Sequence, residues 1–216
     1  MGSEHEKRLA AEAAAKLVED GMRVGLGTGS TVGYLLPALA ERSLDLRCVA
    51  TSDVTERAAR ELGLRVESFA GADALSELDI AIDGADQVAA SGWAVKGGGG
   101  AHTREKAVAA AAARFVLIVS SDKLVERLHP PVPLELLEFG LAATVRRLGD
   151  VELRAAPWSP DGGVIADYVG AVDYPEALSA RLSATVGVVE HGLFPPALVS
   201  DVIVARGEQV ERRQIP

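Results

Sequence analysis

Short apolar runs alternate with alanine-rich amphipathic segments along the first 120 or so residues of the chain. The alternation predicts β-strands separated by α-helices, which favours an α/β fold with an open, mostly parallel, Rossmann-like sheet and helices on both faces. The predicted strands cover residues 24–26, 46–50, 65–69, 79–83 and 115–119, with a short extended piece at 93–96. The predicted helices cover residues 4–20, 32–42, 54–62 and 103–114.

A glycine-rich turn, GLGTGST at residues 25–31, leads into the second predicted helix. Ser30 or Thr31 is the expected N-cap, and Pro37 should kink the helix or mark a later start. The turn matches neither the P-loop nor the dinucleotide fingerprint. It is either a plain strand–turn–helix connection or a phosphate cradle that uses Thr28, Ser30 and Thr31, and we favour the cradle.

The pattern changes after residue 127, where HPPVP at 129–133 interrupts the alternation. We expect a smaller α+β (ferredoxin-like) domain at residues 128–198, which would serve oligomerisation, and a catalytic domain formed by residues 1–127 and 199–216. A strand at 201–205 would return to the first sheet, and the tail at 208–213 would be solvated surface. The small domain would contain strands at 134–137, 151–155, 163–169 and 185–189 and helices at 139–148 and 174–183.

Composition narrows the classes of partner. The formal net charge of the 216 residues is −9, which argues against nucleic acid or an anionic membrane surface as the main partner. The single cysteine, Cys48, excludes an internal disulfide and a cysteine-based metal cluster. The N-terminal segment lacks the apolar core of a signal peptide, so we expect a cytoplasmic protein.

The run at residues 79–106 concentrates the candidate chemistry. Asp83 and Asp86 follow a predicted strand, Lys96 precedes four consecutive glycines, and Glu105 begins a helix. Taken singly, the aspartates could cap a turn and Glu105 could be a surface charge. As a group they suit proton transfer next to a carbonyl, with a carboxylate base and a cation for the developing oxyanion. A metal site is weakly supported, and no motif indicates a Ser-His-Asp hydrolase.

The motifs GLGTGST, DIAIDGAD, KGGGG and SSDKLV, in this order and spacing, resemble ribose-5-phosphate isomerase of the A type. The resemblance is close over the first 127 residues and looser through GVVEHGLF at 187–194. It implies interconversion of ribose 5-phosphate and ribulose 5-phosphate through an enediolate, in the pentose phosphate pathway. It also implies a site without metal or cofactor, a small-molecule sugar phosphate as the binding partner, and a homodimer or homotetramer.

The resemblance also implies roles for individual residues. Glu105 would be the general base, Lys96 would stabilise the enediolate oxygen, and Asp83 and Asp86 would position hydroxyls and assist ring opening. Lys7 is a further candidate phosphate contact. The substrate-binding residues would be Thr28, Gly29, Ser30, Thr31, Gly84, Ala85, Gly97, Gly98, Gly99 and Lys123.

Three departures from the family pattern stand out: Gln87 in place of glutamate, His102 at a position that is often apolar, and an altered segment at 158–167. The alternatives to this isomerase are a non-catalytic phosphosugar-binding sensor on the same fold, an isomerase of another sugar phosphate, or a deaminating isomerase of amino sugar phosphates.

Overall fold

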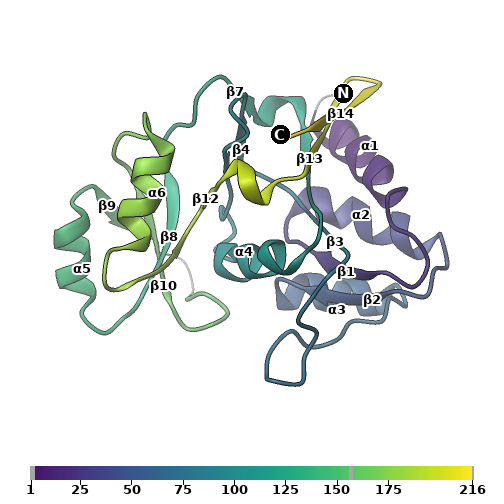
Figure 1. Ribbon diagram of the computed structural model, residues 1–216, viewed down its shortest axis with the longest axis horizontal. Coiled ribbons are helices and arrows are strands. Elements are labelled where there is room, and N and C mark those ends of the chain that lie inside the picture. The colour runs from purple at the N-terminus through teal and green to yellow at the C-terminus, as the bar shows by residue number, and fades with distance from the viewer. Residues whose placement is uncertain (1–2, 156–157, 216) are drawn as a thin grey trace.

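The computed structural model describes residues 3–155 and 158–215. A six-stranded sheet with the order β14-β13-β6-β3-β1-β2 forms its larger part (Figure 1). Every neighbouring pair is parallel except the β13–β14 hairpin, so the predicted α/β architecture is confirmed. The strands are β1 (Arg23–Leu26), β2 (Arg47–Ala50), β3 (Ile80–Asp83), β6 (Phe115–Ser120), β13 (Asp201–Arg206) and β14 (Gln209–Gln214).

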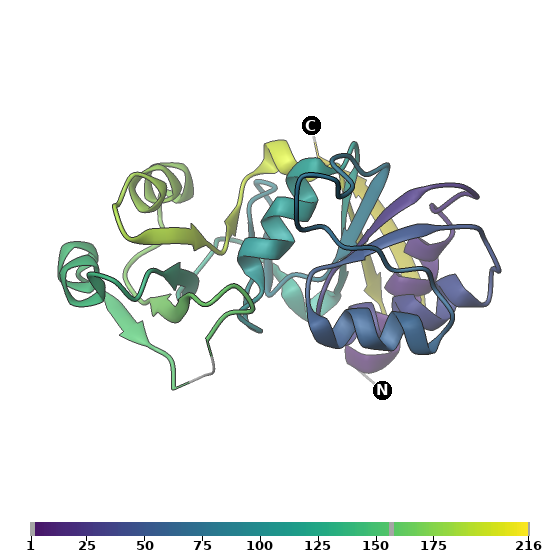
Figure 2. The same cartoon turned by 90° about the horizontal axis from the view of Figure 1, so that it is seen from below.

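Helices cover both faces of this sheet because its inner strands are apolar on both sides. Ile80 and Ile82 of β3 belong to the core under the helices α1 and α2, whereas Ala81 between them packs in the core of α4 with Val108. Figures 1 and 2 show α1 and α2 on one side of the sheet and α4 on the other. The helices are α1 (Ser3–Ala15), α2 (Ser30–Ala40), α3 (Asp53–Glu61) and α4 (His102–Ala111).

A second, four-stranded sheet is antiparallel throughout, with the order β11-β8-β10-β9. Two helices, α5 and α6, join it in one apolar core, as expected for the α+β part of the chain. Figure 2 shows this part beside the larger sheet, with α4 between them. Its elements are β8 (Val132–Leu136), α5 (Leu141–Leu148), β9 (Val151–Leu153), β10 (Val164–Tyr168), α6 (Pro175–Ser183) and β11 (Val188–His191).

A third sheet, with the order β12-β5-β4-β7, was not predicted. Its strands have two or three residues each, too few for a hydrophobic period to be recognised. Ala89, Val95 and Leu193 from this sheet belong to the core of the second sheet, so the small sheet joins the two larger parts. The strands are β4 (Gln87–Ala89), β5 (Ala94–Val95), β7 (Leu124–Val125) and β12 (Leu193–Phe194), with short 3₁₀ helices at Ser121–Lys123 and Pro196–Leu198.

Several local predictions were wrong. The segment 65–69 forms no strand and contributes a single bridge between Val66 and Cys48. The first helix ends at Ala15, five residues before the predicted end. The tail at 208–213 is exposed, as predicted, although most of it forms the strand β14. These segments lie at the margins of the fold, where pairing with a neighbour decides the structure more than local pattern does.

The start of α2 also differs from the prediction. Its N-cap is Gly29, with φ 121°, and no side chain caps the helix, so neither Ser30 nor Thr31 acts as N-cap. Pro37 lies inside the helix and does not delay its start. The uncapped first turn leaves its backbone N–H groups available to a ligand. Within the described residues, no helix is long and apolar enough to cross a membrane.

Candidate functional site

The carboxyl ends of β1, β3 and β6 meet at one edge of the large sheet and border a cavity of about 170 Å³. This is the edge at which open α/β sheets bind ligands. Asp83 lies at the end of β3, behind the cavity wall. The cavity is lined by Lys7, Thr28, Gly29, Ser30, Thr31, Gly84, Ala85, Asp86, Lys96, Gly97, Gly98, Gly99, Glu105 and Lys123. The structure therefore brings together all the residues singled out from the sequence.

A buried triad of charges adjoins the cavity, with Lys96 and Glu105 in its lining and Asp83 behind them. The Lys96 Nζ lies 2.9 Å from Asp83 Oδ2 and 3.1 Å from Glu105 Oε2, and all three side chains are at most 5% exposed. Lys96 Nζ also donates a hydrogen bond of 2.5 Å to the carbonyl oxygen of Gly84. One ammonium is thus shared between two carboxylates from different elements, β3 and α4.

The electrostatics of the triad poise Glu105 for proton transfer. Burial and the negative charge of Asp83 raise the pKa of Glu105 to about 7, although the charge of Lys96 opposes the shift. Burial by itself would lower the pKa of Lys96, but the charges of Asp83 and Glu105 raise it overall. Lys96 therefore remains an ammonium at neutral pH, while Glu105 can both accept and release a proton.

Asp83 is held in place by the backbone. Its Oδ1 accepts hydrogen bonds from the N–H of Thr28 at 3.1 Å and of Gly84 at 2.7 Å. Gly27 makes this approach possible, because a Cβ at that position would lie 1.9 Å from the Asp83 Cγ. Gly27 was not among the predicted site residues, and the only signal in the sequence is its place in the glycine-rich turn.

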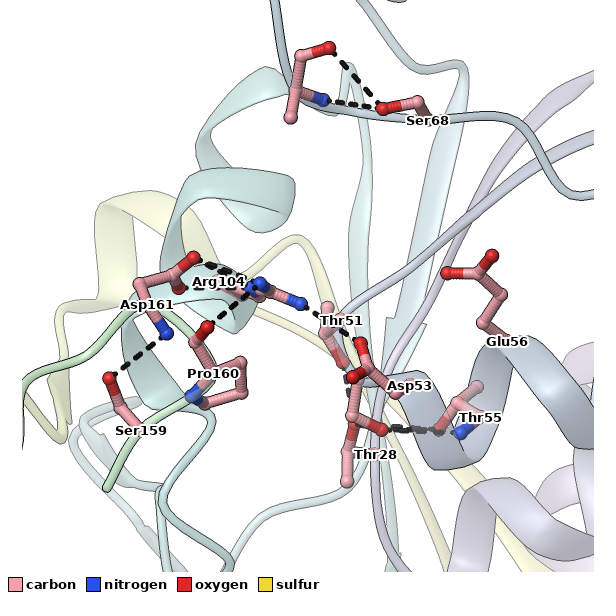
Figure 3. A network of polar contacts seen from close by, with 12 residues as sticks. Thr28, Thr51, Asp53, Thr55, Glu56, Ser68, Arg104, Ser159, Pro160 and Asp161 are labelled. Atoms are coloured by element: carbon pink, nitrogen blue, oxygen red, sulfur yellow. Dashed lines mark hydrogen bonds and ion pairs between the residues drawn. The ribbon is translucent and has the colours of Figure 1, made fainter.

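The hydroxyl group of Thr28 bonds to side chains at the start of α3 and just before it. Its hydroxyl lies 2.7 Å from the Thr51 Oγ1 and donates to the Ser52 Oγ at 2.8 Å (Figure 3). In the predicted phosphate cradle, Thr28 therefore orders the turn, and the open helix start at Ser30 and Thr31 faces the ligand space. Lys7 from α1 and Lys123 from the 3₁₀ helix place two cations beside it.

Two arginines that were not singled out from the sequence connect this edge to the second sheet. Arg104, next to Glu105 on α4, lies 2.9 Å from Asp161 and 3.4 Å from Asp53 (Figure 3). Arg154 donates hydrogen bonds to backbone carbonyl groups of the four consecutive glycines at residues 97–100, which we call the glycine run. Neither could be assigned from local pattern, because arginines are common and the contacts that bring these two to the site join residues more than fifty positions apart.

The three departures from the family pattern have defined surroundings. Gln87 is buried and exchanges hydrogen bonds with the backbone of His129, at 2.8 and 2.9 Å. His102 is fully buried against Gly97, and burial lowers its pKa to about 4, so the ring is neutral at pH 7. In the altered segment, Ser159 bonds to Glu135, while Asp161 pairs with Arg104.

Metal ligands are not grouped in the part of the chain that the structure describes: no three His, Cys, Asp or Glu side chains there are placed to hold an ion. The two buried carboxylates of the cavity instead face the ammonium of Lys96.

Comparisons with known proteins agree with this geometry. The family model described as ribose 5-phosphate isomerase A (phosphoriboisomerase A) matches residues 47–209. A Methanosarcina acetivorans protein described as ribose-5-phosphate isomerase A is 44% identical over 205 residues, which cover 88% of this chain and 86% of that protein. Ribose 5 phosphate isomerase A from Neisseria gonorrhoeae has a similar structure, with a TM-score of 0.91 at 32% identity, covering 97% of this chain and 96% of that one.

A further solved structure is a D-ribose-5-phosphate isomerase in complex with phospho-erythronic acid. It has a TM-score of 0.92 and 32% identity to this chain, and the match covers 99% of this chain and 100% of the other. Sequence, fold and site geometry thus lead to the same assignment. The chain belongs to the ribose 5-phosphate isomerase A family.

Proposed function

We propose that this chain interconverts D-ribose 5-phosphate and D-ribulose 5-phosphate, in the pentose phosphate pathway, with Glu105 as the general base. The observation that carries the mechanism is the buried Glu105 carboxylate, which lies 3.1 Å from the Lys96 ammonium at the cavity and has a pKa of about 7. A base with a pKa near the working pH is well matched to moving a proton between two carbons.

In the forward direction, the Glu105 carboxylate removes the proton from C2 of the open-chain aldose. The electrons of the C–H bond form the C1–C2 double bond, and the carbonyl oxygen O1 takes the negative charge of the enediolate. The buried ammonium of Lys96 stabilises that charge. A proton then passes from O2 to O1, and Glu105 returns its proton to C1, which gives the ketose.

The two aspartates would support the reaction in different ways. Asp83 accepts two backbone N–H groups and pairs with Lys96, so it keeps the ammonium aimed at the reacting oxygens. Asp86 is exposed at the cavity, where one oxygen accepts the Gly98 N–H at 2.8 Å. Its remaining lone pairs can accept a substrate hydroxyl and assist opening of the sugar ring.

The phosphate would bind at the opposite side of the site, at the start of α2. The first-turn N–H groups at Ser30 and Thr31 carry the positive end of the helix dipole. Lys7 and Lys123 line the same cavity and add two positive charges. This local pocket accommodates an anion although the whole chain has a net charge of −9.

A substrate panel tests the proposed function. The purified protein should convert ribose 5-phosphate with a kcat/KM at least about a hundredfold above those for other aldose phosphates, because a site that hydrogen-bonds hydroxyls discriminates strongly. Comparable or better turnover of another aldose phosphate would identify a different isomerase. Binding of ribose 5-phosphate without turnover would identify a sensor.

We further propose that residues 1–127 and 199–216 form the catalytic domain, that residues 128–198 form a small oligomerisation domain, and that the protein works in the cytoplasm as a homodimer or homotetramer. Exposed apolar side chains in the connections of residues 128–198 support an interface, among them Phe139 at 96% and Val186 at 78% exposed. Such patches commonly mark contacts between proteins. Sedimentation velocity measures the subunit number, and a monomer would contradict the proposed homodimer or homotetramer. Cell fractionation tests the proposed cytoplasmic location.

A further inference from the structure

The guanidinium of Arg154 links the second sheet to the glycine run of the cavity. Arg154 follows β9 and pairs with both oxygens of Asp167 on β10, each at 2.6 Å. Its Nη1 donates to the carbonyl oxygens of Gly97 at 3.2 Å and Gly98 at 2.9 Å. The arginine and the aspartate are each only 19% exposed, so the contact is largely shielded from water.

These contacts orient two successive peptide groups. In a trans peptide, the C=O of one residue and the N–H of the next point in opposite directions. With the Gly97 and Gly98 carbonyls turned toward Arg154, the N–H groups of Gly98 and Gly99 point away from it. The Gly98 N–H meets Asp86, which lines the cavity, at 2.8 Å. The Gly99 N–H is thereby directed to the same side, and successive N–H groups arranged in this way favour oxygen anions.

We propose that Arg154, held by Asp167, is a positioning residue that aims the Gly99 N–H at a substrate oxygen. The inference rests on the proposed function, since it treats the cavity as the sugar-phosphate site. It makes the second sheet part of the active site, because Arg154 directly follows the strand β9 of that sheet and is held by Asp167 of β10. The run needs such support: Gly97 and Gly100 have φ of 101° and 76°, and a polyglycine segment is otherwise flexible.

Only arginine suits this position. Its planar fork can hold a carboxylate with two N–H groups while a third nitrogen contacts two carbonyl oxygens. A lysine retains the charge but has a single ammonium on a flexible chain, and it cannot reproduce this geometry. The substitution Arg154→Lys thus separates the charge of the residue from its geometry.

The test measures binding and turnover separately. For Arg154→Gln we expect the KM for ribose 5-phosphate and the Kd for phospho-erythronic acid to rise about tenfold, near the upper range for one net hydrogen bond. The kcat should change less than about threefold, because Glu105 and Lys96 are held by other contacts. Arg154→Lys should behave like Arg154→Gln. The double variant with Asp167→Asn should bind no more weakly than Arg154→Gln alone, since the pair acts as a unit.

Arg23→Gln is the matched control. Arg23 also forms a two-pronged contact with an aspartate, Asp79, at 2.8 and 3.1 Å, but at the start of β1, far along the strand from the cavity. A general loss of stability would appear in the thermal unfolding of both variants, whereas the rise in KM and Kd should be confined to Arg154. Unchanged KM and Kd in Arg154→Gln, or an equal rise in Arg23→Gln, would overturn the proposal. Calorimetry with phospho-erythronic acid measures the role of Arg154 in binding without any need for turnover. If the unmodified protein does not turn over ribose 5-phosphate, that result refutes the proposed function and leaves the binding test of Arg154 in place.

Discussion

Glu105→Gln lowers the kcat for ribose 5-phosphate by about a hundredfold or more, the usual scale for the loss of a general base. Glutamine is nearly isosteric and can keep a hydrogen-bonding contact near Lys96, so the cavity retains its shape. It cannot accept a proton from C2. The substrate should therefore still bind, with a KM close to that of the unmodified protein, and the loss should appear in kcat.

The pH profile provides a second readout of the same residue. Since the pKa of Glu105 is raised to about 7, the base is largely ionised above neutrality and becomes protonated as the pH falls below it. The kcat/KM of the unmodified protein should therefore fall on the acid side with an apparent pKa near 7. The phosphate of the substrate titrates near 6 and would contribute a separate limb. In Glu105→Gln, the limb near 7 should disappear.

Glu176→Gln serves as a control, because Glu176 is an exposed carboxylate in the first turn of another helix, α6. Its kcat and pH profile should match those of the unmodified protein. Turnover near the normal rate in Glu105→Gln, or an acid limb near pH 7 that survives the substitution, would show that another group is the base.

Lys96→Gln should lower the kcat by about a hundredfold to a thousandfold, the range measured when one donor to a developing oxyanion is removed. The substitution also leaves the carboxylates of Asp83 and Glu105 buried without a cation. Their mutual repulsion favours protonation, so the pKa of Glu105 should rise further above its ordinary value. The residual activity should consequently have its acid limb at higher pH than in the unmodified protein.

Lys106→Gln separates the loss of a buried charge from the loss of the oxyanion partner. Lys106 is also largely buried and pairs with Glu190 at 2.7 Å, but it does not line the cavity. Both variants should unfold at lower denaturant concentration, because each leaves a carboxylate without its partner. Only Lys96→Gln should show the large loss of kcat. Equal losses of kcat in the two variants would argue against a direct role of Lys96.

Much of the architecture could be predicted because it depends on local pattern. The apolar runs at residues 79–83 and 115–119 are continuous and bounded by turn residues, so β3 and β6 were identified within one residue at each end. The alternation of strands with helices then implied a parallel sheet. The strand β12 was missed because two residues contain no period, whereas β5 lies within the extended piece predicted at residues 93–96.

The candidate site likewise contains residues that local motifs predicted and residues that they did not. Asp83, Lys96 and Glu105 could be proposed from their motifs, since their residue types and order are unusual as a set. Gly27 was missed, because its importance arises from a contact with Asp83, 56 positions along the chain, that has no local signature.

The sequence by itself determined the alternating α/β pattern, the family and the chemical groups available for proton transfer, since periodicity and motifs are local properties of the chain. Only the tertiary structure decided that Glu105 is buried and lies close to Asp83 and Lys96. Burial and the charge of Asp83 raise the pKa of Glu105 to about 7, against the effect of the Lys96 ammonium. The tertiary structure likewise decided that Arg154 contacts the glycine run. Distances and burial between remote segments produce these properties, because electrostatic energy depends on separation in space and on access to water.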